Sequence, residues 1–162
     1  MRSGRLLGIY TAPREGAPMV AHDAIDALAG RGLAGDRYAL AAGTYSGMRI
    51  EDAQRAVTLF ARETLDAVAA EHGIELAAHE TRRNLLVDGV PLNDLVGTRF
   101  RVGAVEMRGV DLAHPCAYLE SLTRPGVLRA LVDRGGLRAE ILTSGSIAIG
   151  DEVTWTSGDE DE

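Results

Sequence analysis

The sequence predicts a mainly β domain with peripheral helices, of the α+β class, in which the sheet closes into a barrel. Short apolar, β-branched segments outnumber helical ones, at roughly eight or nine against three or four. They often follow one another directly across Gly-containing turns, an order that favours an antiparallel or mixed sheet. The 162 residues fit one domain. We expect it to cover residues 1–155, followed by an acidic disordered tail at 156–162.

The first third of the chain predicts alternating short elements. Residues 5–10 (RLLGIY) predict a strand, followed by a polar turn. Residues 23–30 (DAIDALAG) predict a helix, because their apolar residues recur at helical spacing. Residues 32–38 (GLAGDRY) predict a Gly-punctuated turn into another short strand, and residues 42–53 predict a loop.

The rest of the chain adds one clear helix among strands. Residues 55–60 (RAVTLF) predict a strand, and residues 61–73 predict a helix that ends at Gly73. The next elements expected are strands in NLLVDG, TRFRVG and VEMRGVDL, one or two helical turns in AYLESLT, and a short helix at 125–136. The chain is expected to close with a hairpin-like pair, LRAEILTSG and SIAIGDEVTW, joined at Ser144 and Gly145.

Composition excludes several classes of function. The net charge of −7 argues against nucleic-acid binding, which needs positive charge to displace counterions. No segment predicts a signal peptide or a membrane span, so we expect a soluble cytoplasmic protein with no membrane partner. All basic residues are Arg and none is Lys. A Schiff base needs a lysine amine, so this chain cannot bind pyridoxal phosphate covalently. Arg, however, is well suited to holding phosphate.

The only cysteine, Cys116, stands in DLAHPCAYLE and is the first candidate for chemistry. A lone cysteine excludes internal disulfides and metal sites built from several thiolates. It can be a small buried apolar residue, a reactive thiol or a metal ligand. Pro115 fits the first turn of a helix, which would place Cys116 at the helix N-terminus. His114 is either a loop residue or the imidazole partner of the thiolate.

Other candidates lie in Arg-rich segments. In TRRNLLVDG, Arg82 and Arg83 form either a solvated strand entrance or an anion clamp, to which Asn84 would add an amide donor. Asp36 and Arg37 in GLAGDRY are read as part of a plain turn. The glycines of RGGLRAE would allow positive φ or a close approach to a ligand.

Taken in order, GLAGDRY, TRRNLLVDGVPLNDLVGTRFRVG, HPCAYLE and PGVLRALVDRGGLRAEILTSGSIAIGD resemble the MOSC domain, the C-terminal domain of molybdenum-cofactor sulfurases. The resemblance runs from about residue 5 to about 153 and is best over 82–151. It implies a MOSC-type closed β-barrel and a functional cysteine at Cys116. It also implies a molybdenum cofactor (molybdopterin), with Cys116 as catalytic residue and metal ligand.

The same resemblance implies that Arg82, Arg83 and Asn84 lie near the cofactor, with His114 as a weaker addition. The pyridoxal-phosphate domain of full-length sulfurases is absent here, so the chain resembles a stand-alone bacterial member. Three functions stay open. The first is a molybdenum-dependent oxidoreductase that reduces N-hydroxylated compounds with a redox partner. The second is a sulfur carrier that accepts a persulfide on Cys116 from a separate cysteine desulfurase. The third is a non-enzymatic binding barrel.

Overall fold

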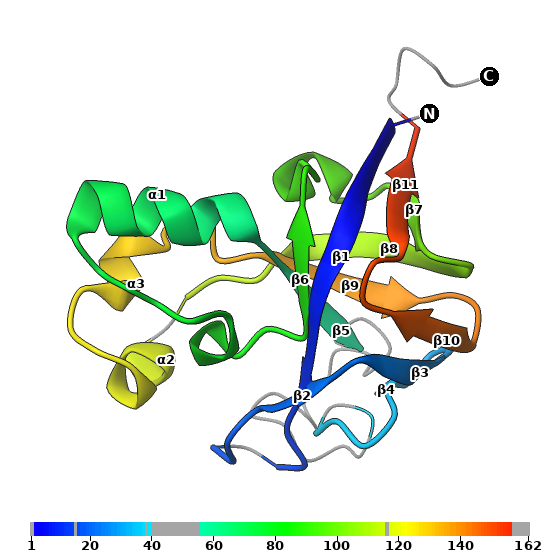
Figure 1. Cartoon of the computed structure of the whole chain (residues 1–162), viewed down its shortest axis with the longest axis horizontal. Helices are drawn as coiled ribbons and strands as arrows, with labels where there is room; N and C mark the ends of the chain where they lie inside the picture. The colour runs from blue at the N-terminus through cyan, green and yellow to red at the C-terminus, as the bar shows by residue number, and fades with distance from the viewer. Residues whose placement is uncertain (1, 15, 38, 40–55, 116, 157–162) are drawn as a thin grey trace.

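The computed structural model describes residues 2–14, 16–37, 39, 56–115 and 117–156. Its centre is a closed barrel in which β11–β7–β8–β9–β5–β6–β1 are neighbours in that order and β11 pairs with β1 (Figure 1). All neighbours are antiparallel except β5 and β6, which are parallel. The barrel strands are β1 (Arg2–Thr11), β5 (Val57–Ala61), β6 (Leu85–Asp88), β7 (Arg99–Val102), β8 (Val105–Leu112), β9 (Leu137–Ile141) and β11 (Glu152–Trp155).

Smaller elements extend the barrel at one end. β2 (Val20–His22) pairs with the end of β1. A separate sheet has the order β10 (Gly145–Ala148), β3 (Ala24–Leu28) and β4 (Gly32–Leu33). Because β1 begins beside the end of β11 and runs the length of the barrel, Thr11 lies at the end away from Trp155 (Figure 1). Four of the sequence candidates, Arg82, Arg83, Asn84 and His114, lie at this far end.

Inward-facing side chains from every barrel strand form the main core. Strand residues alternate between the two faces, as in β9, where Leu137, Ala139 and Ile141 are buried and the residues between them are partly exposed. Barrel closure removes the exposed edges that an open sheet would leave. The predicted fold class, mainly β with peripheral helices and a closed barrel, is confirmed.

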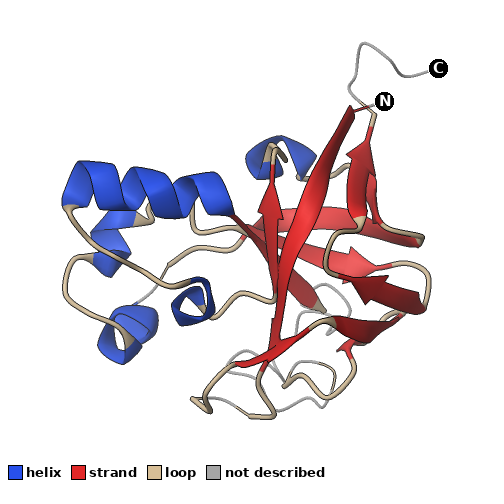
Figure 2. Cartoon of the chain, in the orientation of Figure 1, coloured by secondary structure: helices blue, strands red, loops and turns tan. Residues whose placement is uncertain are grey.

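The helices α1 (Arg62–His72), α2 (Ala117–Leu122) and α3 (Val127–Ala130) lie together on one side of the barrel (Figure 2). They share a second core, formed by Phe60, Val68, Leu76, Leu119, Val127, Ala130 and Leu131. The 3₁₀ helices are η2 (Ala78–Thr81) and η3 (Leu92–Leu95). Gly73 ends α1 with φ of 67°, as predicted. Among the described helices, none combines the length and apolar character needed to cross a membrane.

Three local predictions are wrong or need shortening. Within the helix predicted at 23–30, Ala24–Leu28 form strand β3, because pairing with both β10 and β4 outweighs the helical spacing of a few apolar residues. The predicted C-terminal hairpin does not form, because β9 pairs with β5 and β8 while β10 pairs with β3. The helix expected at 125–136 is limited to Val127–Ala130. The predicted loop at 42–53 lies outside the described residues, as does all of the predicted tail except Thr156.

Glu80 predicts a measurable pH dependence of stability. The backbone N–H of Ala77 donates to its carboxylate at 2.9 Å and Arg124 donates at 2.8 Å, and these bonds lower the pKa of Glu80. Its stabilising effect is therefore present above its ordinary pKa of 4.5 and is lost as pH falls through the lowered value. We expect Glu80→Gln to reduce the free energy of unfolding by up to about 1 kcal/mol near neutral pH, because the pair is partly exposed.

The difference between Glu80→Gln and the wild type should shrink when chemical denaturation is repeated at a pH below the lowered pKa. Glu152→Gln, an exposed substitution in β11, serves as the control. A Glu80→Gln effect of the same size at both pH values would contradict the assignment.

Candidate functional site

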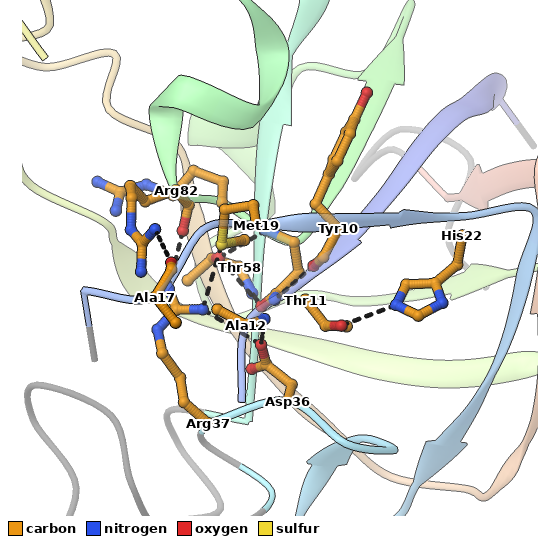
Figure 3. Close-up of polar contacts among 12 residues, drawn as sticks. Tyr10, Thr11, Ala12, Ala17, Met19, His22, Asp36, Arg37, Thr58 and Arg82 are labelled. Carbon is orange, nitrogen blue, oxygen red and sulfur yellow. Dashed lines mark hydrogen bonds and ion pairs between the residues drawn. The ribbon is translucent and has the colours of Figure 1, made fainter. Parts of the chain in front are cut away.

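The far end of the barrel is organised around Asn84, which immediately precedes β6. Asn84 is fully buried. Its side-chain oxygen accepts bonds from the backbone N–H of Thr58 at 3.0 Å and from the hydroxyl of Thr58 at 3.2 Å. Its side-chain nitrogen donates to the carbonyl of Tyr10 at 3.0 Å. One amide therefore joins β1, β5 and the start of β6. At the same end, Thr11 and His22 are hydrogen-bonded at 2.8 Å, which ties β2 to β1 (Figure 3).

Arg83 fixes the chain that leads to Cys116. Its Nε donates to the carbonyl of Gly135 at 2.8 Å. Its Nη2 donates to the carbonyls of Ala113 at 3.1 Å and His114 at 3.4 Å. One guanidinium group therefore bridges the start of β9 and the segment after β8. The planar, multi-donor shape of Arg suits this bridging, which a single ammonium group would not reproduce.

Two glycines let these segments approach each other. A Cβ on Gly135 would lie 2.3 Å from the carbonyl oxygen of Ala113 and 3.0 Å from Pro115. Gly136 has φ of 112°, and a Cβ there would lie 2.4 Å from the carbonyl oxygen of Leu59. Gly136 also accepts a bond from the backbone N–H of Ala113 at 2.8 Å. The predicted close approach at these glycines is thus made to backbone of the same chain.

Arg82 turns the chain between η2 and β6. It has φ of 62° and ψ of 20°, the left-handed region, in which a non-glycine residue costs about 1–2 kcal/mol. Its backbone N–H donates to the carbonyl of His79, and its Nη1 donates to the carbonyl of Ala17 (Figure 3). A Cβ on Gly16 would lie 3.0 Å from the hydroxyl of Tyr118. The loop after β1 therefore lies between Arg82 and the first turn of α2.

Asp36 and Arg37 form a buried ion pair, at a position where the sequence predicts a plain turn. Asp36 is 0% exposed and Arg37 is 5% exposed, and the two are 3.2 Å apart. Asp36 also accepts the backbone N–H of Ala12 at 3.0 Å. Arg37 donates to the carbonyl of Arg82 at 3.0 Å and lies 3.6 Å from the sulfur of Met19 (Figure 3). The available signal was a charged pair inside the small, apolar stretch GLAGDRYA.

The structure therefore brings most of the predicted site residues to one end of the barrel. Arg82, Arg83 and Asn84 are consecutive there, and Arg83 contacts the backbone of His114. His114 itself is exposed. Cys116 lies outside the described residues, directly after Pro115 and before the first residue of α2.

Two other features bear on ligand binding in the described part of the chain. A cavity of about 240 Å³ borders Gly136 and Arg134 and is lined on its other sides by residues at the start of α1 and by η3. Arg82, Arg83 and His114 do not line it. Within the described ranges, no cluster of three or more His, Asp or Glu side chains is placed to hold a metal ion.

These features define a class of protein: a closed β-barrel with an Arg-rich end, where Arg83 holds the backbone of the segment between β8 and α2. A family model for the MOSC domain matches residues 32–154. The chain therefore belongs to the MOSC domain family. Comparison with curated protein sequences finds no significant match.

Solved structures share the fold over nearly the whole chain. The YuaD protein of Bacillus subtilis has a TM-score of 0.80 and 20% identity, with 94% of each chain covered. YiiM of Escherichia coli has a TM-score of 0.68 and 18% identity, covering 97% of this chain and 71% of that one. YiiM of Geobacillus stearothermophilus has a TM-score of 0.63 and 14% identity, covering 96% and 76%. At these identities the similarity demonstrates a common fold.

Proposed function

We propose that this protein binds the molybdenum cofactor, with the thiolate of Cys116 as a ligand to molybdenum, and that it reduces N-hydroxylated compounds with a separate redox partner. Membership of the MOSC domain family supports the cofactor. The observation that carries the proposal is the set of bonds from Arg83 to Ala113, His114 and Gly135, which hold the chain just before Cys116 against the barrel. A ligand residue needs such support, because loosely held side chains bind metals weakly.

The residues at this end of the barrel suit the molybdenum cofactor, an anionic group whose metal already carries most of its ligands. Arg83 places a guanidinium charge next to the segment that leads to Cys116, and Arg82 places a second one beside the loop after β1 at the same end of the barrel. Positive charge favours the thiolate over the thiol and attracts a phosphate group. A thiolate is a soft ligand and suits a metal already bound by sulfur. Asn84, the next residue in the chain, contributes from inside the barrel by joining β1 and β5 to the start of β6.

The bound cofactor would supply the redox chemistry. In the overall reaction, an electron pair from the redox partner enters the N–O bond of the substrate. That bond breaks, protons are taken up, and an N–H group and water result. The chain's own contribution is to hold Cys116, to place the arginines and to orient the substrate. We place this activity in the cytoplasm, where a lone thiol stays reduced.

Metal and pterin content test this proposal. The full chain is produced in a host that makes the molybdenum cofactor, purified natively, and analysed for molybdenum and pterin per chain. We expect near-stoichiometric molybdenum in the wild type and almost complete loss in Cys116→Ala. Cys116→Ser should lose it as well, because a hydroxyl is a harder and far less acidic ligand. Ser121→Ala, which truncates an exposed side chain in nearby α2, should retain the metal.

The sulfur-carrier alternative predicts a different result in the same preparation. The chain contains one thiol and no lysine to generate a persulfide with pyridoxal phosphate, so sulfur would come from a separate desulfurase. Intact-mass measurement would then show one extra sulfur on Cys116, removable by reductant, in protein without molybdenum. Wild-type protein without molybdenum, or equal molybdenum content in the wild type and Cys116→Ala, would overturn the proposed oxidoreductase.

A further inference from the structure

The left-handed conformation of Arg82 decides where two consecutive arginines point. The Arg82 side chain bonds to the loop after β1, at Ala17, whereas the Arg83 side chain bonds to Ala113 and His114 on another segment. Strand alternation does not produce this divergence, because β6 begins only at Leu85. The divergence depends on the turn at Arg82, so whatever holds that turn also sets the directions of both guanidinium groups.

The buried pair Asp36–Arg37 holds this turn from inside. Arg37 donates to the backbone carbonyl of Arg82, the residue that adopts the left-handed conformation at this turn. The same guanidinium group is oriented by Asp36 and contacts Met19. Asp36 is in turn oriented by the backbone N–H of Ala12. The pair thus connects the end of β1, the loop after it and the segment before β6 (Figure 3).

The burial of both charged side chains, Asp36 and Arg37, indicates that the pair has a role other than stability. Removing two charges from water is costly, and a well-packed apolar pair of similar volume is often at least as stable. A buried ion pair is therefore weak evidence for stability, and its benefit must be sought in the geometry that it imposes. Here that geometry is specific, because the pair bonds to the backbone of a candidate site residue.

We propose that Asp36 and Arg37 are positioning residues that fix the turn at Arg82 and thereby aim Arg82 and Arg83 at the two segments that flank the cofactor site. The role of the pair in cofactor binding rests on the proposed function. The positioning of Arg82 by the pair does not depend on a bound cofactor. The pair touches no reacting group in this assignment. It acts through Arg82.

The test separates positioning from stability with a double variant. Arg37→Met alone removes one ion-pair contact from the buried Asp36 carboxylate and is expected to be destabilising. Asp36→Asn with Arg37→Met removes both charges, keeps an oxygen for the N–H of Ala12 and fills the space of the arginine stem. The matched control is Arg108→Met with Glu140→Gln, which removes a partly exposed ion pair between β8 and β9. Arg37→Lys is a second variant that keeps the charge but loses the bridging geometry.

Three measurements are made on the full-length chain: the thermal unfolding midpoint, amide hydrogen exchange by peptide mass spectrometry, and the rate of molybdenum loss during dialysis. In the double variant we expect exchange to rise roughly tenfold or more in peptides covering 12–19 and 79–84, because bonds to charged groups are lost there. Peptides from β7 and β8 should not change. Molybdenum should dissociate at least about tenfold faster, while the control pair behaves like the wild type.

Each outcome decides the matter. Localised exchange together with faster molybdenum loss, in a variant whose unfolding midpoint recovers relative to Arg37→Met, supports positioning. Exchange that rises evenly along the chain, or molybdenum retention that recovers with stability, assigns the pair a purely structural role and overturns the inference. Localised exchange with unchanged molybdenum retention also overturns the role of the pair in binding.

If the wild type holds no molybdenum, the proposed function fails, and hydrogen exchange alone decides whether the pair positions Arg82. Should the double variant not fold, Arg37→Lys provides the same readouts.

Discussion

Replacement of Asn84 by alanine is expected to lower the free energy of unfolding by about 3–5 kcal/mol. The amide of Asn84 is fully buried and bonds to Thr58 and Tyr10. Truncation leaves the buried backbone N–H of Thr58 without its side-chain acceptor, at about 1–3 kcal/mol, and removes a donor from the partly buried carbonyl of Tyr10. A small cavity adds to the loss. For a domain of this size, the melting temperature should fall by roughly 10 °C.

Asn93→Ala is the matched control for this prediction. Asn93 also donates from its side-chain nitrogen to a backbone carbonyl, that of Asp133 at 2.8 Å, but it is exposed. Loss of this hydrogen bond should lower the free energy of unfolding by less than about 1 kcal/mol, because water replaces the Asn93 amide as the donor. Chemical denaturation of both variants measures the difference. Equal effects at the two positions would refute the assigned role of Asn84 as the internal tie between β1, β5 and β6.

Replacement of Arg83 by methionine is expected to release the segment before Cys116. The three carbonyls that Arg83 holds lose a charged donor, and each such bond contributes about 1.5–3 kcal/mol where it is shielded from water. Because Arg83 is partly exposed, water compensates part of this loss, and we expect destabilisation of about 1–3 kcal/mol. The effect on the site should be of similar size, with molybdenum affinity reduced about 10–100-fold, as for other residues that support a metal ligand.

Arg83→Lys distinguishes charge from geometry in this prediction. Lysine keeps the positive charge but cannot bridge Gly135 and Ala113 with a planar fork, so we expect it to resemble Arg83→Met in molybdenum affinity. Arg101→Met, at an exposed position of β7, is the control and should leave affinity unchanged. Molybdenum and pterin retained per chain after dialysis of the purified variants provide the measurement. If Arg83→Lys bound molybdenum as tightly as the wild type, charge alone would explain the role of Arg83.

Local patterns were sufficient for the elements that depend on neighbouring residues. The strand that became β1, the helix α1 with its stop at Gly73, and the strands β6, β7 and β8 follow from short-range signals. Residues 23–30 show where such signals fail. Their apolar spacing fits a helix, but β10, more than a hundred residues later, supplies the backbone partners that make them a strand. β9 and β10 are neighbours in sequence but pair with strands remote from each other.

The same distinction holds for the site. Residue types and motif order pointed to the segments containing Arg82, Arg83, Asn84 and Cys116, because charge and sulfur chemistry belong to the side chains themselves. The roles of the first three depended on the tertiary structure. Barrel closure buried Asn84 between strands, aimed Arg83 at backbone carbonyls, and converted the turn at Asp36 and Arg37 into a buried ion pair. Hydrogen-bond partners far apart in sequence meet only after the barrel has closed. The sequence alone therefore determined which chemistry is present, and the fold decided which groups hold the others in place.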